Sequence, residues 1–573
     1  MEISAATHPG EAFYPEGVHW DDPIARGTLP ELLSKAAASY GARPAIEFRD
    51  RPISYAGLQA MVDVAAAALL RAGYGKGTSV ALFLGNGPDH PVNFFGALKA
   101  GARVVHLSPL DGERALSHKL SDSGARILVT SNLAALLPMA LKFLEKGLLD
   151  RLIVCDDDDW GAVGNPHTPI PDHPAIVSFR NFVAGAGLPA QWPQVSVDDV
   201  ALLQYTGGTT GLPKGAMLSH GNLTSAVSIY DVWGKPARAE RDAVERVICV
   251  LPLFHIYALT VILLRSLERG DLISLHQRFD VAAVMRDIEV KRATVFPGVP
   301  TMWIAIASLP DLESRDLSSL VSCGSGGAPL PVEVARIFER KTHMKLKSGW
   351  GMTETCSPGT GHPPEGPEKP GSIGLMLPGI EMDVVALDDP ARMLGPGEVG
   401  EIRIKGPNVT RGYWNRPQET AQAFVGDHFL TGDIGYMDQD GYFYLVDRKK
   451  DMIISGGFNV YPQMIEQAIY EHPAVQEVIV IGIPDDYRGE AAKAFVKLRA
   501  GAAPFTLDEL KAFLAGKLGK HEIPAALDFV DELPRTSVGK LSRHELRNQN
   551  SLQQPSPQPA QPKQPQLATG GHG

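Results

Sequence analysis

Cysteine is scarce in this sequence. The 573 residues contain only four cysteines, which are Cys155, Cys249, Cys323 and Cys356. No two of them form a CxxC pair, so neither a zinc knuckle nor a dithiol redox motif is indicated. Sparse, unpaired cysteines suit a reducing cytoplasm, which is therefore the location we expect.

Long apolar runs are missing as well. The first residues, MEISAATHPGEAFYP, lack a basic start followed by an apolar stretch, so we expect no signal peptide. The mostly apolar run from Ala258 to Leu264 ends at Arg265 and is far too short to span a bilayer. These observations predict a chain without a transmembrane segment and leave peripheral membrane contact open.

Positive charge is not in excess either. The formal net charge is −11, which argues against a general nucleic-acid binder because nothing offsets phosphate repulsion over the whole surface. The remaining composition, 44% hydrophobic and 21% charged, is ordinary for a globular protein. Because 573 residues exceed what one hydrophobic core normally serves, we expect at least two domains.

Strand and helix patterns alternate over residues 78–130. TSVALFLGN, RVVHLSP and RILVTS are typical of buried strands, and NFFGALKAG and LSHKLSDSGA lie between them as helices. Such alternation predicts parallel βαβ units, and a similar rhythm recurs around residues 246–300. From about residue 399 the pattern changes, and EIRIKG and GYFYLVD look like short antiparallel strands.

A compact α+β pattern follows Asp451. A helix begins at Pro462, and VQEVIVIGI and AKAFVKL are typical of strands. We therefore predict a large α/β N-terminal domain of βαβ units with a β-rich subdomain (1–447), a hinge (448–451) and a small, mobile α+β C-terminal domain (452–548). The remaining residues, 549–573, are rich in Gln and Pro and are predicted to be disordered.

The strongest local signal is YTGGTTGLPKG, residues 205–215, which follows the short apolar strand ALLQY. Glycines let backbone amides wrap an anion, and the hydroxyls and the lysine add donors. The segment is not a Walker A loop, because Pro213 precedes Lys214 and no Ser or Thr follows it. A flexible surface turn is the alternative, but the density of Thr, Gly and Lys favours a phosphate-binding loop.

YTGGTTGLPKG resembles the phosphate-loop signature of the adenylate-forming superfamily of acyl-CoA synthetases, luciferases and peptide-synthetase adenylation domains. Further segments resemble the motifs of this family and follow in its order: LPLFH (251–255), GSGGAP (324–329), GWGMTE (349–354), LTGD (430–433), DRKKD (447–451) and PRTSVGK (534–540). The resemblance covers roughly residues 30–548. It is nearest to bacterial long-chain fatty acyl-CoA synthetases, notably in VDRKKDMI and GFNVYP.

The resemblance implies a site for adenylation of a carboxylic acid by ATP and for transfer of the acyl group to coenzyme A, with magnesium required. The implied catalytic residues are Lys540, Thr353, Glu354 and His255. The implied magnesium ligands are Thr206 and Glu354. The implied nucleotide-binding residues are Thr206, Gly207, Gly208, Thr209, Thr210, Gly211, Lys214, Gly326, Gly327, Ala328, Gly349, Trp350, Gly351, Met352, Asp433 and Arg448.

The same resemblance implies how the two reactions follow each other. A carboxylate is a poor electrophile, so it attacks the α-phosphate of ATP first, and Lys540 would bridge these two anions. The C-terminal domain would then swing about Lys450 and present Gly456 and Gly457 to coenzyme A. Apolar residues near His255 would form the acyl pocket, and those expected are Phe254, Ile256, Tyr257, Thr301, Met302 and Trp303.

Each residue also has a plain structural interpretation when taken alone. Asp433 fits a turn, Glu354 a helix N-terminal charge, Lys540 a solvated loop, and His255 a structural role. Taken together and in order, the functional hypothesis is favoured. In one departure, many relatives have tyrosine where Trp350 stands; stacking on adenine should survive there, but any contact of the phenol oxygen is lost.

The substrate is less defined than the reaction. A medium- or long-chain fatty acid is our expectation, with dicarboxylic and aromatic acids as alternatives. Some fatty-acid relatives carry a tryptophan gate where this sequence has Leu259. Two rival hypotheses are an adenylation module that loads a carrier protein and a non-catalytic nucleotide-binding protein with a degenerate site. A lysine acetyltransferase acting on Lys540 is a further expected partner, because acetylation would remove its charge.

Overall fold

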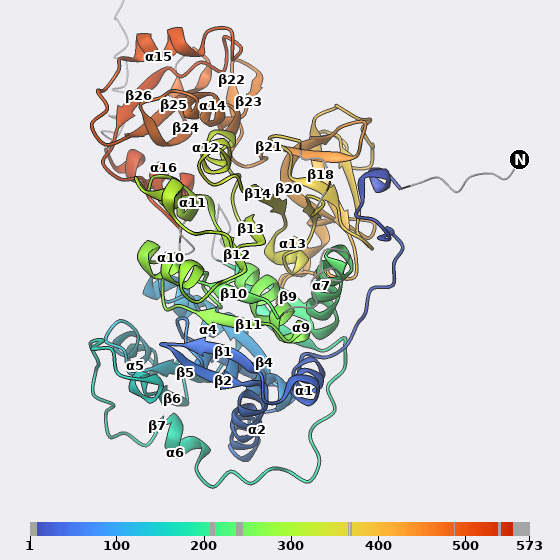
Figure 1. Cartoon of the computed structure of the whole chain (residues 1–573), viewed down its shortest axis with the longest axis vertical. Coiled ribbons are helices and arrows are strands. Elements are labelled where there is room, and N and C mark those ends of the chain that lie inside the picture. Colours follow the sequence, from blue (N-terminus) through green and yellow to red (C-terminus); the bar gives the residue numbers. More distant parts are fainter. Residues whose placement is uncertain are drawn as a thin grey trace, which may run out of the picture.

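The computed structural model describes residues 8–206, 213–235, 244–364, 366, 369–485, 487–536 and 540–553 (Figure 1). The first layer is a seven-stranded sheet in the order β7-β6-β5-β3-β4-β8-β9. Its strands are parallel except for the β8–β9 hairpin, which confirms the βαβ units predicted for residues 78–130. These strands are β3 (Ser79–Leu82), β4 (Arg103–His106), β5 (Ile127–Ser131), β6 (Arg151–Cys155), β7 (Ile176–Ser178), β8 (Val200–Thr206) and β9 (Lys214–Ser219).

Helices cover this sheet and bury the apolar faces of the strands. The strands of the βαβ core are almost wholly buried, as expected for a parallel sheet with both faces covered. The helical elements of this part are α2 (Tyr55–Arg71), α3 (Asp89–Lys99), α4 (Glu113–Ser123), α5 (Leu137–Glu145), η2 (Asp157–Trp160) and α6 (Phe179–Val183).

The second layer is a 14-stranded sheet that changes character along its length. From β2 to β14 it is mostly parallel, and from β15 onward all pairings are antiparallel. The expected antiparallel strands EIRIKG and GYFYLVD are β18 and β21. The strands are β1 (Pro44–Phe48), β2 (Arg51–Ser54), β10 (Arg246–Cys249), β11 (Leu272–Leu275), β12 (Val295–Gly298), β13 (Ser322–Ser325), β14 (Leu346–Trp350), β15 (Thr360–Gly361), β16 (Gly374–Met376), β17 (Glu381–Val385), β18 (Gly400–Lys405), β19 (Phe424–Val425), β20 (His428–Met437) and β21 (Tyr442–Arg448).

Local sequence sets the ends of several helices around this second sheet. Thr28 and Glu31 form a capping box at the start of α1, and Ser219 and Asn222 form another at α7. The helical elements are η1 (Glu11–Phe13), α1 (Leu29–Tyr40), α7 (His220–Trp233), η3 (Ala258–Leu264), α9 (Arg265–Arg269), α10 (Val281–Glu289), α11 (Pro300–Ala307), η4 (Leu312–Ser314), α12 (Val332–Thr342), η5 (Thr353–Thr355) and α13 (Pro417–Gln422).

A five-stranded sheet forms a separate layer after residue 452, drawn in orange and red in Figure 1. Its order is β23-β22-β25-β24, with β26 beside β25. The helix expected at Pro462 is α14, whose Ile465 and Ile469 are fully buried. The elements are β22 (Ile453–Ser455), β23 (Phe458–Val460), α14 (Pro462–Tyr470), β24 (Val475–Asp485), β25 (Gly489–Leu498), α15 (Leu507–Leu514), β26 (Ala526–Phe529) and α16 (Arg543–Gln553).

The end of α16 corrects one expectation. Disorder was predicted from residue 549, but α16 continues to Gln553. Between Arg543, where α16 begins, and Pro555 the sequence contains no proline, and the residue that precedes a proline is disfavoured in a helix, which agrees with an end at Gln553. The rest of the predicted tail, residues 554–573, lies outside the described residues.

The apolar run from Ala258 to Leu264 forms the π-helix η3, which continues directly into α9. Single π-helical turns are often found at functional sites. Within the described ranges, every helix is either too short or too polar to cross a membrane.

Candidate active site

A cavity of about 2290 Å³ lies where the large sheets meet the C-terminal sheet. It is larger than an ordinary small-molecule site and has room for more than one ligand. Most of the candidate site residues line it: Thr206, Lys214, Phe254, His255, Ile256, Tyr257, Thr301, Gly326, Gly327, Ala328, Gly349, Trp350, Gly351, Met352, Thr353, Glu354, Asp433, Arg448, Lys450 and Lys540. Segments more than 300 residues apart in the sequence therefore share one wall.

Some candidates are placed elsewhere. Gly207, Gly208, Thr209, Thr210 and Gly211 lie outside the described residues, so the loop between Thr206 and Lys214 is not described. Gly456 and Gly457 form the turn between β22 and β23, both with positive φ, and they are not among the residues that line the cavity. The positive φ angles of this hairpin turn explain both glycines without any ligand.

Met302 and Trp303 were expected in the acyl pocket, and this expectation is wrong. Neither residue lines the cavity, whereas Thr301 and Ile304 of the same helix do. Trp303 turns away into the core, where its indole packs against Phe296 and donates a hydrogen bond to the Gly324 carbonyl (3.1 Å). The reason is helical geometry, since consecutive residues of α11 point to different faces.

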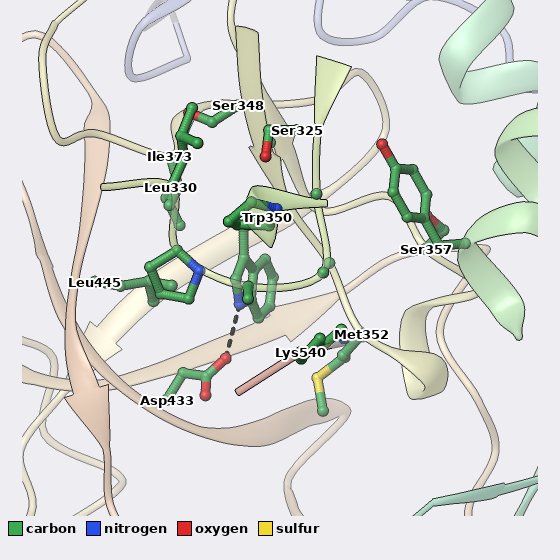
Figure 2. Close-up of a pocket in the computed structure, with 18 of the residues that line it drawn as sticks. Ser325, Leu330, Ser348, Trp350, Met352, Ser357, Ile373, Asp433, Leu445 and Lys540 are labelled. Atoms are coloured by element: carbon green, nitrogen blue, oxygen red, sulfur yellow. Dashed lines mark hydrogen bonds between the residues drawn. The ribbon is translucent and has the colours of Figure 1, made fainter. Parts of the chain in front are cut away.

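Trp350 and Asp433 form the polar centre of the site (Figure 2). The Trp350 indole N–H donates to Asp433 Oδ2 (2.7 Å), and Arg448 Nε lies 3.0 Å from Asp433 Oδ1. Each carboxylate oxygen has a second lone pair, so Asp433 can still accept hydrogen bonds from a ligand. Trp350 thus has a polar role here, because it orients this carboxylate.

Glu354 offers a second carboxylate to the cavity. It is buried, and Tyr413 donates its hydroxyl hydrogen bond to Glu354 Oε1 (2.8 Å). Burial raises the pKa of Glu354, while the Tyr413 hydrogen bond opposes that rise. The Lys214 ammonium lies 5.5 Å from the centre of the Tyr413 ring, so a cation and a carboxylate share one aromatic neighbour.

His255 lines the cavity beside the apolar residues Phe254 and Ile256. Its Nδ1 accepts from the Tyr257 backbone N–H (3.2 Å), so the neutral ring carries its proton on Nε2. Burial lowers the pKa of His255 to about 3, and the nearby charge of Lys540 acts in the same direction. His255 is therefore a neutral hydrogen-bond donor at ordinary pH.

Lys540 reaches the same cavity from the C-terminal part of the chain. Its aliphatic stem lies against Gly327, where an added Cβ would stand 2.8 Å from Lys540 Cε. Gly327 has φ of +81°, so both its backbone angle and its neighbour require glycine. Burial, with repulsion from Arg448, lowers the pKa of Lys540 to about 8.

Ion pairs hold the C-terminal sheet in this position. Asp447, at the end of β21, accepts hydrogen bonds from Arg543 Nη1 (2.9 Å) and from the Gln463 backbone N–H (2.7 Å). Arg543 also donates to Glu466 on α14 (3.0 Å), and Arg547 binds Asp451 (2.8 Å). The two Asp447 contacts join the strand before the predicted hinge to helices after it, Arg547 ties α16 to the hinge residue Asp451, and the Arg543–Glu466 pair joins two helices of the C-terminal part.

Tyr230, Arg265 and Tyr413 are among the residues of the cavity wall that sequence reasoning missed. Tyr413 and Tyr230 belong to no motif quoted above. Arg265 follows Tyr257 and Val261 at steps of four residues, which is the signal that could have found it.

The chain matches two family models. Residues 33–414 match the model described as "AMP-binding enzyme", and residues 464–540 match "AMP-binding enzyme C-terminal domain". Among curated proteins, a long-chain-fatty-acid–CoA ligase of Bacillus subtilis is 36% identical over 534 residues, covering 91% of this chain and 94% of that protein. A feruloyl-CoA synthase of Amycolatopsis sp is 38% identical over 492 residues, with coverage of 83% and 90%.

Solved structures agree with this match. ATP-bound MatB from Rhodopseudomonas palustris superposes with a TM-score of 0.81 at 30% identity, covering 91% of this chain and 99% of that one. The o-succinylbenzoate coenzyme A synthetase of Bacillus subtilis, in complex with ATP and magnesium ion, gives a TM-score of 0.75 at 28% identity, covering 90% and 99%. The similarity thus extends over nearly the whole of both chains.

Proposed function

This chain belongs to the AMP-binding enzyme family, and from that premise we propose that it is an acyl-CoA synthetase whose substrate is a medium- or long-chain fatty acid. The enzyme would form an acyl-adenylate from the acid and ATP and then transfer the acyl group to coenzyme A. The observation that carries the proposal is the meeting of Lys540, His255 and Asp433 on one cavity, although they come from three distant segments.

In the first half-reaction two anions must approach each other. The Lys540 ammonium would lie between the acid's carboxylate and the α-phosphate of ATP, and His255 would donate its Nε2–H to the carboxylate. A carboxylate oxygen then forms the bond to the α-phosphorus while the bond to the β-phosphate oxygen breaks and pyrophosphate leaves. Because His255 is neutral, it adds a directed donor without the cost of burying a second charge.

Asp433 and Trp350 would hold the nucleoside. Asp433 has free lone pairs for the two ribose hydroxyls, and Trp350 and Arg448 fix its orientation from either side. The indole would stack on adenine while its N–H stays on Asp433. Thr353 and Lys214 would meet the phosphates, together with the backbone of the loop after Thr206.

The residues present fit a magnesium ion. Glu354 supplies a buried carboxylate and Thr206 a hydroxyl oxygen on the same cavity, and Mg²⁺ prefers such hard oxygen ligands. The bound ion would neutralise negative charge on the β- and γ-phosphates of ATP. Tyr413 would keep the Glu354 carboxylate pointed at this position through its 2.8 Å hydrogen bond.

We also propose that residues 1–447 form the catalytic body, 448–451 a hinge and 452–548 a mobile domain. Support comes from the five-stranded sheet, which shares no hydrogen-bonded strand with the other two sheets in the described part of the chain. Rotation about Lys450 would withdraw Lys540 and bring the Gly456–Gly457 turn to coenzyme A. That turn has open space around both glycines, so it is free to meet a ligand.

Two observations support a fatty acid as the substrate. The first is the name of the Bacillus subtilis relative, a long-chain-fatty-acid–CoA ligase. The second is the apolar wall of the cavity near His255, which includes Phe254, Ile256 and Val261. An aromatic acid is the second candidate, because the feruloyl-CoA synthase is similarly identical over most of the chain.

The test is AMP and pyrophosphate release with a panel of saturated, dicarboxylic and cinnamic-type acids, with and without coenzyme A. We expect saturated medium- or long-chain acids to give AMP release that depends on coenzyme A. AMP release that requires a carrier protein would contradict coenzyme A as acceptor. Turnover with cinnamic-type acids alone would replace the fatty acid with an aromatic substrate.

The pKa of Lys540 predicts how adenylation depends on pH. Below about pH 8 the ammonium is charged and can bridge the two anions, and above it the charge is lost. The kcat/KM for ATP, which reports ionisations of the free enzyme, should therefore fall as pH rises through about 8. The measurement is ATP–pyrophosphate exchange between about pH 6 and pH 10, with the ionic strength held constant because salt screens charge interactions.

A Lys540→Arg variant provides the control, because a guanidinium stays charged throughout this range. The ATP–pyrophosphate exchange that this variant retains should not fall as the pH rises above about 8. If exchange in Lys540→Arg still falls with rising pH as in the wild type, a group other than Lys540 causes the fall.

A further inference from the structure

The acyl side of the cavity leads along one helix to an arginine. Tyr257, immediately before η3, Val261 on η3 and Arg265 at the start of α9 follow one another at steps of four residues, and all three line the cavity. Residues at this spacing lie on one helix face. Because the π-helical turns of η3 rise less per residue than the roughly 1.5 Å of an α-helix, the backbone of Arg265 lies at most about 12 Å beyond that of Tyr257. Arg265 therefore lines the same cavity as His255, about two helical turns beyond Tyr257, which is hydrogen-bonded to His255.

The guanidinium of Arg265 has no hydrogen-bond acceptor within the described part of the chain. No described residue accepts a hydrogen bond from it, and its Nε is buried without a partner. Among the described residues Arg265 forms one ion pair, with Asp231 on α7, whose Oδ1 lies 3.9 Å from Arg265 Nε, too far for a hydrogen bond. The same Asp231 oxygen already accepts from Arg269, so the carboxylate is shared between two arginines.

The neighbours of Arg265 are also donors. Tyr230 lies under the guanidinium, with its ring centre 5.6 Å away, and its hydroxyl lies 3.3 Å from Ser357 Oγ. The Tyr257 hydroxyl has no hydrogen-bond partner among the described residues. Burial raises the pKa of both tyrosines, so both hydroxyls stay protonated. One cation and two hydroxyls thus face the same space.

A plain alkyl chain is a poor occupant of this end. It would remove water from a guanidinium without returning an acceptor, and a buried guanidinium with unmade hydrogen bonds is costly even when a carboxylate lies 3.9 Å away. An oxygen atom at the far end of the acyl chain would accept from Arg265 and restore the lost hydrogen bonds. The apolar residues between His255 and Arg265, such as Val261 and Ile304, suit the methylene groups of the same molecule.

We propose that Arg265 is a specificity residue, and that the preferred acid is a fatty acid with an oxygen acceptor at its far end, either a hydroxyl, a carbonyl or a second carboxylate. This inference rests on the proposed acyl-CoA synthetase activity and narrows its substrate. Tyr230 and Tyr257 would be additional donors to the same oxygen.

The experiment compares acids of equal length. For each chain length from octanoic to hexadecanoic acid, kcat/KM is measured by coenzyme A-dependent AMP release for the plain acid, its ω-hydroxy form and its α,ω-dicarboxylic form. At the best length we expect an oxygenated acid to exceed the plain one by about 10-fold or more. Preference for the diacid alone identifies a carboxylate, and use of both oxygenated forms shows that a neutral oxygen suffices.

Arg265→Leu is the decisive variant. It should lower the ratio of oxygenated to plain acid by about 10- to 100-fold, the usual value of a hydrogen bond to a charged group. Arg286→Leu is the matched control, since Arg286 is an exposed arginine on α10 that pairs with Asp50 outside the cavity. Its ratio should not change.

Melting temperatures show whether Arg265→Leu is folded, and Tyr230→Phe, which removes only a hydroxyl, supplies a milder second variant that should lower the same ratio. A wild-type preference for plain acids at every length, with an unchanged ratio in both variants, would overturn the role of Arg265 and leave the synthetase activity intact. Absence of coenzyme A-dependent AMP release with every acid would instead overturn the proposed function, and this inference with it.

Discussion

Replacing Lys540 with alanine is expected to abolish acyl-adenylate formation and to spare transfer from a supplied acyl-adenylate to coenzyme A. Lys540 lies against Gly327 with its ammonium near His255, where the two anionic reactants would meet. Losing a preorganised cation at such a point typically slows the reaction on the order of 100-fold or more. The second step has no such need, because the adenylate has already formed.

The measurement is a pair of assays on one protein: ATP–pyrophosphate exchange, and thioester formation from purified acyl-adenylate. Lys520→Ala is the matched control, since Lys520 is an exposed lysine of the same domain and does not line the cavity. Unchanged exchange in Lys540→Ala would remove this lysine from the mechanism. Acetylated Lys540 should behave like the alanine variant, because acetylation also removes the charge.

Lys450→Pro is expected to affect the opposite step. Arg448, Lys449, Lys450 and Asp451 form a tight turn in which the Arg448 carbonyl accepts from the Asp451 N–H (2.9 Å). The Lys450 N–H donates no backbone hydrogen bond to the described residues, so proline removes none there. Proline fixes φ at about −65°. A rotation that needs another φ at this residue should then slow thioester formation roughly 100-fold, which corresponds to a barrier about 2.7 kcal/mol higher.

The readout is the ratio of the two half-reaction rates. Proline also restricts the backbone of Lys449, the residue before it. This restriction should slow adenylation and thioester formation alike, so the absolute rates are less informative than their ratio. Lys450→Ala, which keeps φ free, should leave the ratio near that of the wild type. Equal loss in both assays would indicate a misfolded junction, and full activity in both would place the hinge at another residue.

Much of the fold followed from local patterns. The βαβ units of residues 78–130 and the helix at Pro462 have strong periodicity and clear boundaries, and the structure has them where they were expected. The end of α16 was missed because composition marks where a chain cannot form a core, whereas a helix already started can continue past its last buried residue.

The site residues that belong to short sequence motifs could be predicted from the sequence. Asp433, Glu354 and Lys540 belong to short segments with a recognisable order, and all three line one cavity. Tyr413 and Tyr230 could not be found this way, since their position depends on how separate elements pack. Trp303 was assigned wrongly for a related reason: a run of neighbouring residues was taken as one wall, although a helix turns each of them to a different side.

The continuity of the 14-stranded sheet has a consequence for how the protein loses its activity on heating. Strands from β2 to β17 form one hydrogen-bonded unit that carries Asp433, Trp350 and Gly327, whereas Lys540 belongs to a part with its own sheet and its own core. Units that share few hydrogen bonds can open with different free energies. The smaller unit can therefore melt first, and the protein would then hold its nucleotide pocket while it has lost its chemistry.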